Sequence, residues 1–402
     1  MQCALSNDSG RVVQLRPYYF RECSFPCSGW YDYTDPNIGV NNPLDEPCEI
    51  IFDDTDFYYN QWVYVGSAAK IRCINGASFQ RQHGIGHIAT YGSPARLEGF
   101  ASIEIDGVNS YFASYGANSR FSFQPDAEAA LEIPALTLKN GASVKGFHIE
   151  GNGNAGLYVV GSGEWTIPKL YEVNGSYHSS AVLAGFDAAV IAEESVFSIV
   201  GRDEGMSNTG SWLQWNRNVS VAGEFAGYGD VVVSNAVAGN SMEITVTSPL
   251  NTCEGKIVCN GENACSLFFA DGANWAGTVV AGNVSLTNLN GSARAASVDF
   301  GRLDLSADFP VRVWRGADGT LANDTLNVGA YLNNGGRIAP VMMTEGDSFA
   351  FGDKIVLGKV RKGAPLPHVA WGWTATAEEI EGDGDHVQLI LARGRGFMII
   401  VR

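Results

Sequence analysis

Short apolar segments separated by turn residues follow one another along most of this chain of 402 residues. In the segment 242–247, Met-Glu-Ile-Thr-Val-Thr, apolar side chains alternate with polar ones. A period of two is typical of a strand that buries one face and exposes the other. Similar segments begin roughly every 7 to 14 residues, a spacing that favours short strands. The pattern therefore predicts an all-β protein, and only the segment 184–195 indicates a helical turn.

The segment 136–163 shows how such strands can be combined. It holds three short apolar runs, each closed by Asn-Gly, Gly-Asn or Gly-Ser. Glycine and asparagine accept left-handed backbone angles at little steric cost, so these pairs predict tight corners. Strands this short bury a core only when they stack coil upon coil. The spacing is also typical of a sandwich or a barrel, but repeated hairpin turns between long strands are missing from the sequence. The segment therefore favours a β-solenoid.

The two ends of the chain differ from the middle in composition. Residues 1–60 are rich in cysteine, proline and aromatic residues, which predicts an irregular N-terminal cap. The solenoid body is expected over residues 61–345. Residues 346–402 contain longer and more apolar segments, among them a strand expected at 348–351, and a tight turn at 381–386. These features predict a small antiparallel C-terminal β cap.

Two segments resemble repeats of known families. The segment 144–162, Val-Lys-Gly-Phe-His-Ile-Glu-Gly-Asn-Gly-Asn-Ala-Gly-Leu-Tyr-Val-Val-Gly-Ser, resembles a coil of the right-handed parallel β-helix of pectin-lyase-like proteins. The segment 274–289, Asn-Trp-Ala-Gly-Thr-Val-Val-Ala-Gly-Asn-Val-Ser-Leu-Thr-Asn-Leu, is similar to the autotransporter-associated β-strand repeats of bacterial surface proteins. The resemblance implies a right-handed parallel β-helix that is secreted or displayed on a bacterial cell. No run of alternating ten-residue strands follows, so membrane insertion is not expected.

Composition and charge narrow the classes of partner. The chain holds 48 glycines, 45% hydrophobic residues and only 17% charged residues, which indicates a folded chain punctuated by turns. The net charge is −17, from 26 basic and 43 acidic residues. Because phosphate binding needs clustered Lys and Arg, nucleic acid and anionic membrane surfaces are not expected as partners. No apolar run is long enough for a transmembrane helix.

The eight cysteines form one group of five near the N-terminus and one of three in the middle. In a solenoid the two groups lie several coils apart, beyond disulfide reach unless the N-terminal segment folds back. Cys253 and Cys259 could close a small loop, or the thiols could stay buried and unpaired. The first residues show neither a basic start nor an apolar run. A removed leader and a cytoplasmic protein both fit this start, and the fold class favours secretion. The cysteines are Cys3, Cys23, Cys27, Cys48, Cys73, Cys253, Cys259 and Cys265.

Two sets of residues are candidates for catalysis and ligand binding. His148 and Glu150 flank Ile149, so both are expected to face outward together, where they could act as acid and base. Exposed polar residues on any strand would show the same pattern.

The second set contains Trp212, Trp215, Asn216 and Asn218, in which indole rings could stack on sugars and amides could bond hydroxyls. The alternative is that these tryptophans cover the edge of a coil.

The acidic run Asp53, Asp54 and Asp56 offers oxygen ligands for calcium. The glycine spacing of a calcium loop is missing, so a solvated turn is the simpler interpretation. No cofactor is expected.

These observations lead to one functional hypothesis and two alternatives. We expect an extracellular or cell-surface β-helix module with a structural or adhesive role that contacts glycans. A polysaccharide lyase or glycoside hydrolase on the same scaffold is the first alternative. A trimer of the phage tailspike kind is the second, and the sequence leaves the oligomeric state open.

Overall fold

The protein is all-β. The computed structural model describes residues 18–21, 24–25, 48–59, 63–64, 69–81, 95–98, 102–114, 120–124, 136–146, 148–151, 156–167, 180–184, 188–202, 217–239, 241–261, 263–289 and 295–394. Within these residues all regular structure is β-strand, most of it paired in parallel, and no helix is present. The prediction of an all-β protein is therefore confirmed for the described part of the chain.

The chain divides into two compact units. The first comprises Met1–Met242 with Glu262–Ala264, and the second comprises Glu243–Gly261 with Cys265–Arg402. The boundaries expected at residues 60 and 345 stay predictions.

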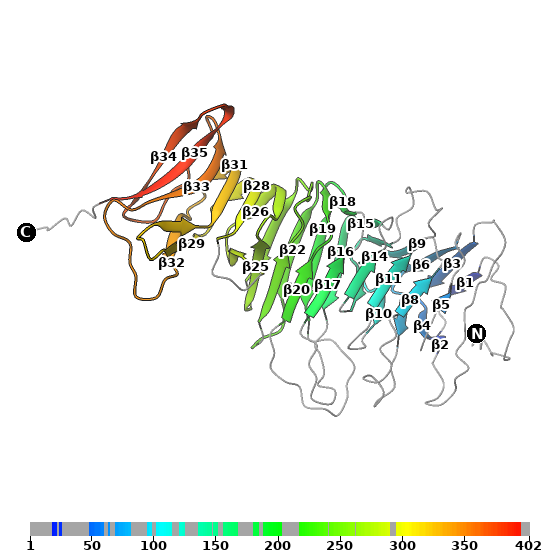
Figure 1. Cartoon of the computed structure of the whole chain (residues 1–402). Helices are drawn as coiled ribbons and strands as arrows, with labels where there is room; N and C mark the ends of the chain where they lie inside the picture. Colours follow the sequence, from blue (N-terminus) through cyan, green and yellow to red (C-terminus); the bar gives the residue numbers. More distant parts are fainter. Residues whose placement is uncertain are drawn as a thin grey trace, which may run out of the picture. The chain divides into compact units, whose positions relative to one another are not determined.

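The first unit contains three parallel sheets whose strands lie side by side (Figure 1). From β3 to β19, each strand pairs with the strand three places later, so successive strands enter the three sheets in turn. The first sheet contains β1 (Tyr18–Arg21), β3 (Cys48–Asp53), β6 (Ala69–Ile74), β9 (Ser102–Asp106), β12 (Leu136–Lys139), β15 (Gly156–Val160), β18 (Ala188–Ile191) and β21 (Phe225–Gly227). The second contains β2 (Ser24–Phe25), β4 (Asp56–Tyr59), β7 (Ser78–Arg81), β10 (Tyr111–Ser114), β13 (Ala142–Lys145), β16 (Ser162–Ile167), β19 (Val196–Gly201) and β22 (Asp230–Asn235). The third contains β5 (Val63–Tyr64), β8 (Ala95–Glu98), β11 (Arg120–Gln124), β14 (His148–Gly151), β17 (Ser180–Ala184) and β20 (Arg217–Val221).

The parallel register places apolar residues above one another in the core. Leu136 pairs with Leu157 and Leu138 with Val159, and all four side chains are buried. The indole of Trp165 is buried in this core and keeps a hydrogen bond, because its Nε1–H donates to a backbone carbonyl at 2.8 Å. Stacking thus gives each short strand an apolar neighbour on both sides.

Left-handed residues form the corners between the first and second sheets. Asn75 and Asn140 have φ angles of 55° and 53°, and each is followed by a glycine with positive φ. Asn140 Nδ2 also donates to Asp106 Oδ1 of the preceding corner at 2.8 Å, and Asn75 Nδ2 donates to Asp53 Oδ1 at the same distance. The prediction that Asn-Gly pairs make tight corners is confirmed at Asn140.

The second unit begins with strands that alternate between two sheets. β23 (Met242–Val246, whose first residue belongs to the first unit), β25 (Cys265–Ala270) and β27 (Val284–Thr287) share one sheet. The other sheet contains β24 (Lys256–Asn260), β26 (Asn274–Val280), β28 (Ser297–Asp304), β31 (Thr325–Leu332), β33 (Lys354–Arg361), β35 (Asp383–Arg393) and β34 (Trp373–Ile380). A small sheet contains β30 (Leu321–Asn323), β29 (Phe309–Arg315) and β32 (Ile338–Met342). The last three strands of the large sheet, β33, β35 and β34, pair antiparallel.

A column of glycines crosses the large sheet of the second unit. Gly277, Gly301 and Gly329 lie next to one another in β26, β28 and β31, and Gly358 lies inside β33 beside Leu326, three positions out of line with Gly329. A Cβ atom at Gly301 would lie 1.8 Å from the backbone oxygen of Ala276, and at the other three positions it would lie 2.0 to 2.5 Å from a backbone oxygen. Such contacts are far inside van der Waals distance, so these strands require glycine for close backbone approach.

Two local predictions are wrong. The segment 184–195 was expected to make a helical turn, but it contains strand β18, whose inward and outward residues alternate. The strand expected at 348–351 is absent, since these residues form an irregular segment and the start of a turn before β33. The tight turn expected in 381–386 is confirmed. It joins β34 to β35 and contains Gly382, which has a positive φ.

Candidate functional site

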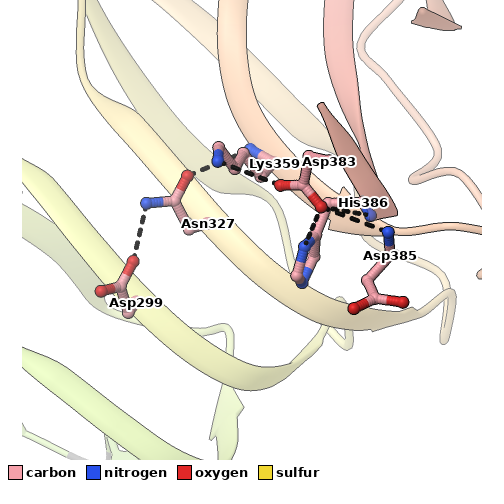
Figure 2. A network of polar contacts seen from close by, with 6 residues as sticks. All are labelled: Asp299, Asn327, Lys359, Asp383, Asp385 and His386. Carbon is pink, nitrogen blue, oxygen red and sulfur yellow. Dashed lines mark hydrogen bonds and ion pairs between the residues drawn. The ribbon is translucent and has the colours of Figure 1, made fainter. Parts of the chain in front are cut away.

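A row of polar side chains crosses four neighbouring strands of the second unit (Figure 2). The polar row consists of Asp299 on β28, Asn327 on β31, Lys359 on β33, and Asp383 and His386 on β35. Asn327 Nδ2 donates to Asp299 Oδ1 at 2.7 Å, and Asn327 Oδ1 accepts from the backbone N–H of Lys359 at 3.1 Å. Lys359 Nζ lies 3.2 Å from Asp383 Oδ2. Because neighbouring strands lie about 4.8 Å apart, the row extends over about 14 Å.

An aspartate and a histidine form the end of the polar row. Asp383 Oδ1 accepts from the backbone N–H groups of Asp385 at 3.2 Å and of His386 at 3.1 Å, and it lies 3.1 Å from His386 Nδ1. The hydrogen bond with His386, aided by that with Lys359, lowers the pKa of the Asp383 carboxyl to about 2. The carboxylate favours the tautomer of His386 that carries its proton on Nδ1, which leaves Nε2 as an acceptor.

The polar row can do two things chemically. Most of its polar atoms bond to one another, so it ties successive strands together. Asp299 and Lys359 are exposed, and 44% of the His386 side chain is accessible. The row therefore offers a carboxylate, an ammonium group and an imidazole to hydroxyl groups outside, and the imidazole can exchange a proton.

Two exposed aromatic side chains lie at corners joined by Arg393. Trp371 and Phe351 are 72% and 66% exposed. Arg393 Nη1 donates to the carbonyl oxygen of Trp371 at 2.9 Å, and the Arg393 carbonyl accepts from Gly352 N–H at 3.0 Å. Gly372 has a φ of 81°, and a Cβ there would lie 2.5 Å from Arg393 Nη1. We call Trp371, Gly372 and Arg393 the Trp371 corner; its backbone is fixed while its indole is open to solvent.

The polar row and the Trp371 corner lie at opposite ends of one strand. Asp383 begins β35 and Arg393 ends it. Ten steps of an antiparallel strand span about 34 Å, so one small ligand does not reach both. Only an extended ligand such as a polymer is long enough to span this distance.

The residues singled out from the sequence fall mostly where side chains are not described. Trp212, Trp215 and Asn216 lie outside the described residues. Asn218 lies in β20, where its backbone pairs with Ser180 of β17. His148 and Glu150 lie in β14, and their backbones pair in parallel with β11 and β17 around the buried Ile149. The acid and base role of this pair stays a prediction, and so does sugar binding at the tryptophans.

The acidic run lies at the corner between β3 and β4. Asp53 is 6% exposed and accepts from Asn75, whereas Asp54 is exposed and adopts a left-handed φ of 45°. Asp56 is exposed and accepts a short hydrogen bond from Ser78 Oγ. Asp53 thus bonds to the corner after β6 and Asp56 to strand β7. Across the described ranges, no three His, Cys, Asp or Glu side chains are grouped as metal ligands would be.

Neither the Trp371 corner nor the polar row is marked by a local pattern in the sequence. In Trp371-Gly372-Trp373 the second indole is buried, with 7% exposure and an edge-to-face contact with Phe349 at a centroid distance of 4.9 Å. Residues two positions apart on a strand share a face, so a period of two does not distinguish Trp371, which lies in the turn before β34. The members of the polar row that bond to one another lie 3 to 32 positions apart in the sequence and are brought together by strand pairing.

Comparison of the chain with models of known protein families gives no match, and a search of curated proteins gives none either. The described ranges include no helix of the length and apolarity that crossing a membrane requires.

Proposed function

We propose that this chain is a right-handed parallel β-helix that serves as an extracellular or cell-surface module, with a structural or adhesive role and a surface for glycans. The parallel pairing of every third strand in the first unit supports the β-helix, because such stacking builds a rigid body from short strands. The net charge of −17 supports a neutral or cationic partner in preference to a polyanion.

The exposed indole of Trp371 carries the glycan proposal. Large aromatic side chains are seldom so open to water, and an indole face stacks on the apolar face of a pyranose ring. The Trp371 corner holds the backbone through Arg393, so the ring is presented from a fixed point and less conformational entropy is lost on binding. The guanidinium of Arg393 adds hydrogen-bond donors for sugar hydroxyls beside the ring.

Binding of the purified chain to a panel of neutral and acidic glycans tests this proposal. The Trp371→Ala variant should lose at least tenfold in affinity for any glycan retained by the parent protein. Tyr228→Ala is the matched control, since Tyr228 is 63% exposed in the first unit and should not contribute. Equal losses in both variants, or none in Trp371→Ala, would contradict the assignment.

The Asp383–His386 pair favours one alternative, a polysaccharide lyase or a glycoside hydrolase. An imidazole oriented by a carboxylate is a general base in many enzymes. The same glycan panel separates the two functions, because an enzyme releases new reducing or unsaturated ends. Release that survives in Trp371→Ala and disappears in His386→Gln would favour the enzyme over the adhesive module.

A further inference from the structure

Three arginines in the described part of the second unit are half-buried, and one of them has no carboxylate partner there. Arg312 pairs with Asp324 at 2.8 Å, and Arg315 pairs with Asp353 at 2.6 Å. The guanidinium of Arg393 makes no ion pair with any described residue. A charge partly removed from water is stabilised by a partner of opposite sign, so Arg393 is the arginine of the three that can take an anionic ligand.

The Trp371 corner holds the Arg393 guanidinium in place. Nη1 donates to the carbonyl oxygen of Trp371 at 2.9 Å, and the guanidinium carbon lies 5.7 Å from the centroid of the Trp373 ring. A Cβ atom at Gly372 would lie 2.5 Å from Nη1 and 3.0 Å from the guanidinium carbon, so glycine leaves the room that this group occupies. The bond from Nη1 is the single hydrogen bond that the guanidinium makes to described residues, so most of its five N–H donors remain. They form a planar fork, which binds a carboxylate through two parallel hydrogen bonds.

The acidic residue whose backbone contacts Arg393 does not neutralise the guanidinium. The Arg393 N–H donates to the carbonyl oxygen of Asp353 at 2.8 Å. The carboxylate of Asp353 accepts instead from Arg315 Nη2 at 2.6 Å and from the N–H of Ala350 at 2.7 Å. The fork of Arg393 is therefore left for a carboxylate from another molecule.

We propose that the Trp371 corner binds a glycan whose terminal sugar carries a carboxylate. This inference rests on the proposed glycan binding at Trp371 and adds the class of sugar that is bound. The carboxylate accepts two hydrogen bonds from Arg393, while the apolar face of a sugar ring stacks on the indole of Trp371. The carbonyl oxygen that holds the guanidinium belongs to the same residue as the indole, so one terminal sugar or two adjacent sugars can contact both groups.

The charge of the chain restricts the ligand to an isolated carboxylate. A net charge of −17 repels a glycan that carries one negative charge on every sugar. A single carboxylate lies beside the guanidinium, and exposed charges more than about 8 Å away are largely screened at physiological salt. A neutral glycan with one terminal acidic sugar should therefore bind more tightly than a polyuronate.

Isothermal titration calorimetry of the full chain with two acidic probes tests the proposal. The probes are sialyllactose and lactose extended by a terminal glucuronic acid. Each is compared with its methyl ester, in which the same ring carries no charge. At least one acid should bind about tenfold or more tightly than its ester, which is the gain expected from hydrogen bonds between charged groups.

Three variants separate carboxylate binding from a structural role of Arg393. Arg393→Gln should bring the ratio of the acid and ester affinities close to one, and Arg393→Lys, which keeps the charge but not the fork, should retain part of the ratio. A purely structural role would weaken the binding of acid and ester equally and leave the ratio unchanged. Arg337→Gln is the matched control, because Arg337 is an exposed arginine of the same unit and its replacement should keep the parent ratio.

The outcomes distinguish this inference from the proposed function. Equal binding of acid and ester by the parent protein overturns the inference and leaves glycan binding intact. Tighter binding of polygalacturonate than of both terminal acids, or an unchanged ratio in Arg393→Gln, also overturns it. If neither the acids nor any member of the glycan panel binds, the proposed function fails as well.

Discussion

The carboxylate of Asp324 is expected to be a major contributor to the stability of the second unit. Its side chain is fully buried and accepts four hydrogen bonds. Arg312 supplies three of them, from Nε at 2.8 Å, Nη2 at 2.9 Å and its backbone N–H at 3.0 Å, and the N–H of Ala296 supplies the fourth at 3.0 Å. The carboxylate thus joins the segment before β28 to β29 and the end of β30.

Replacing Asp324 with alanine removes the acceptor and leaves every donor behind. Two backbone N–H groups and a guanidinium lose their partner, and removal of one partner from a buried pair costs about 3 to 5 kcal/mol. The Arg312 side chain is 21% exposed, so water can recover part of its hydration. We therefore expect a loss near the lower end, about 3 kcal/mol in the free energy of unfolding.

Urea unfolding followed by hydrogen exchange on peptides of the second unit measures this loss locally. Asp347→Ala is the control, because Asp347 is exposed and its replacement should change the free energy by about 0.5 kcal/mol or less. The amides of Ala296 and Arg312 should lose protection first in Asp324→Ala. If Asp324→Ala costs no more than Asp347→Ala, or if these two amides keep their protection, the carboxylate does not have the role described.

Three further predictions follow from residues of the second unit. Gly301→Ala should destabilise by at least 3 kcal/mol, because its Cβ would lie 1.8 Å from a backbone oxygen, whereas Gly384→Ala, with open space around it, should be near neutral in thermal unfolding. Tyr331→Phe should raise stability by about 1 kcal/mol, since the buried hydroxyl has no hydrogen-bond partner in the described residues; a loss of stability in calorimetry would contradict this. The pKa of Asp383 is lowered from 3.8 to about 2, so its stabilising contribution is complete above pH 3.8 and is lost as the pH falls towards 2. Carbon NMR of the carboxyl group should show this low pKa and an upward shift in His386→Ala; an unchanged pKa in the variant would exclude His386 as the main cause.

The all-β character of the chain could be predicted from sequence because period-two alternation is a local property. The segment 242–247 shows this well, since Met242, Ile244 and Val246 are buried and Glu243 is exposed. The segment 184–195 misled because alanine-rich sequence has high helix propensity, which the parallel pairing of β18 with its neighbours overrides.

The contacts between strands could not be predicted, because they depend on register. Arg312 and Asp324 are twelve positions apart, at a spacing that matches no local motif. The alignment of the glycines could not be predicted for the same reason. Gly277, Gly301 and Gly329 lie at unequal intervals in the sequence. Only the pairing of β26, β28 and β31 brings these residues into one line.

The left-handed Asn-Gly corners imply a specific route of chemical ageing. Asparagine followed by glycine is the dipeptide most prone to deamidation, since the small glycine lets its backbone nitrogen attack the side-chain amide. At Asn140 the product would be a carboxylate facing Asp106, where an amide now donates a hydrogen bond at 2.8 Å. Attraction between neighbouring corners would become repulsion between like charges. Stored protein should therefore grow more acidic and loosen first at these corners, while the buried apolar ladders beside them stay chemically unchanged.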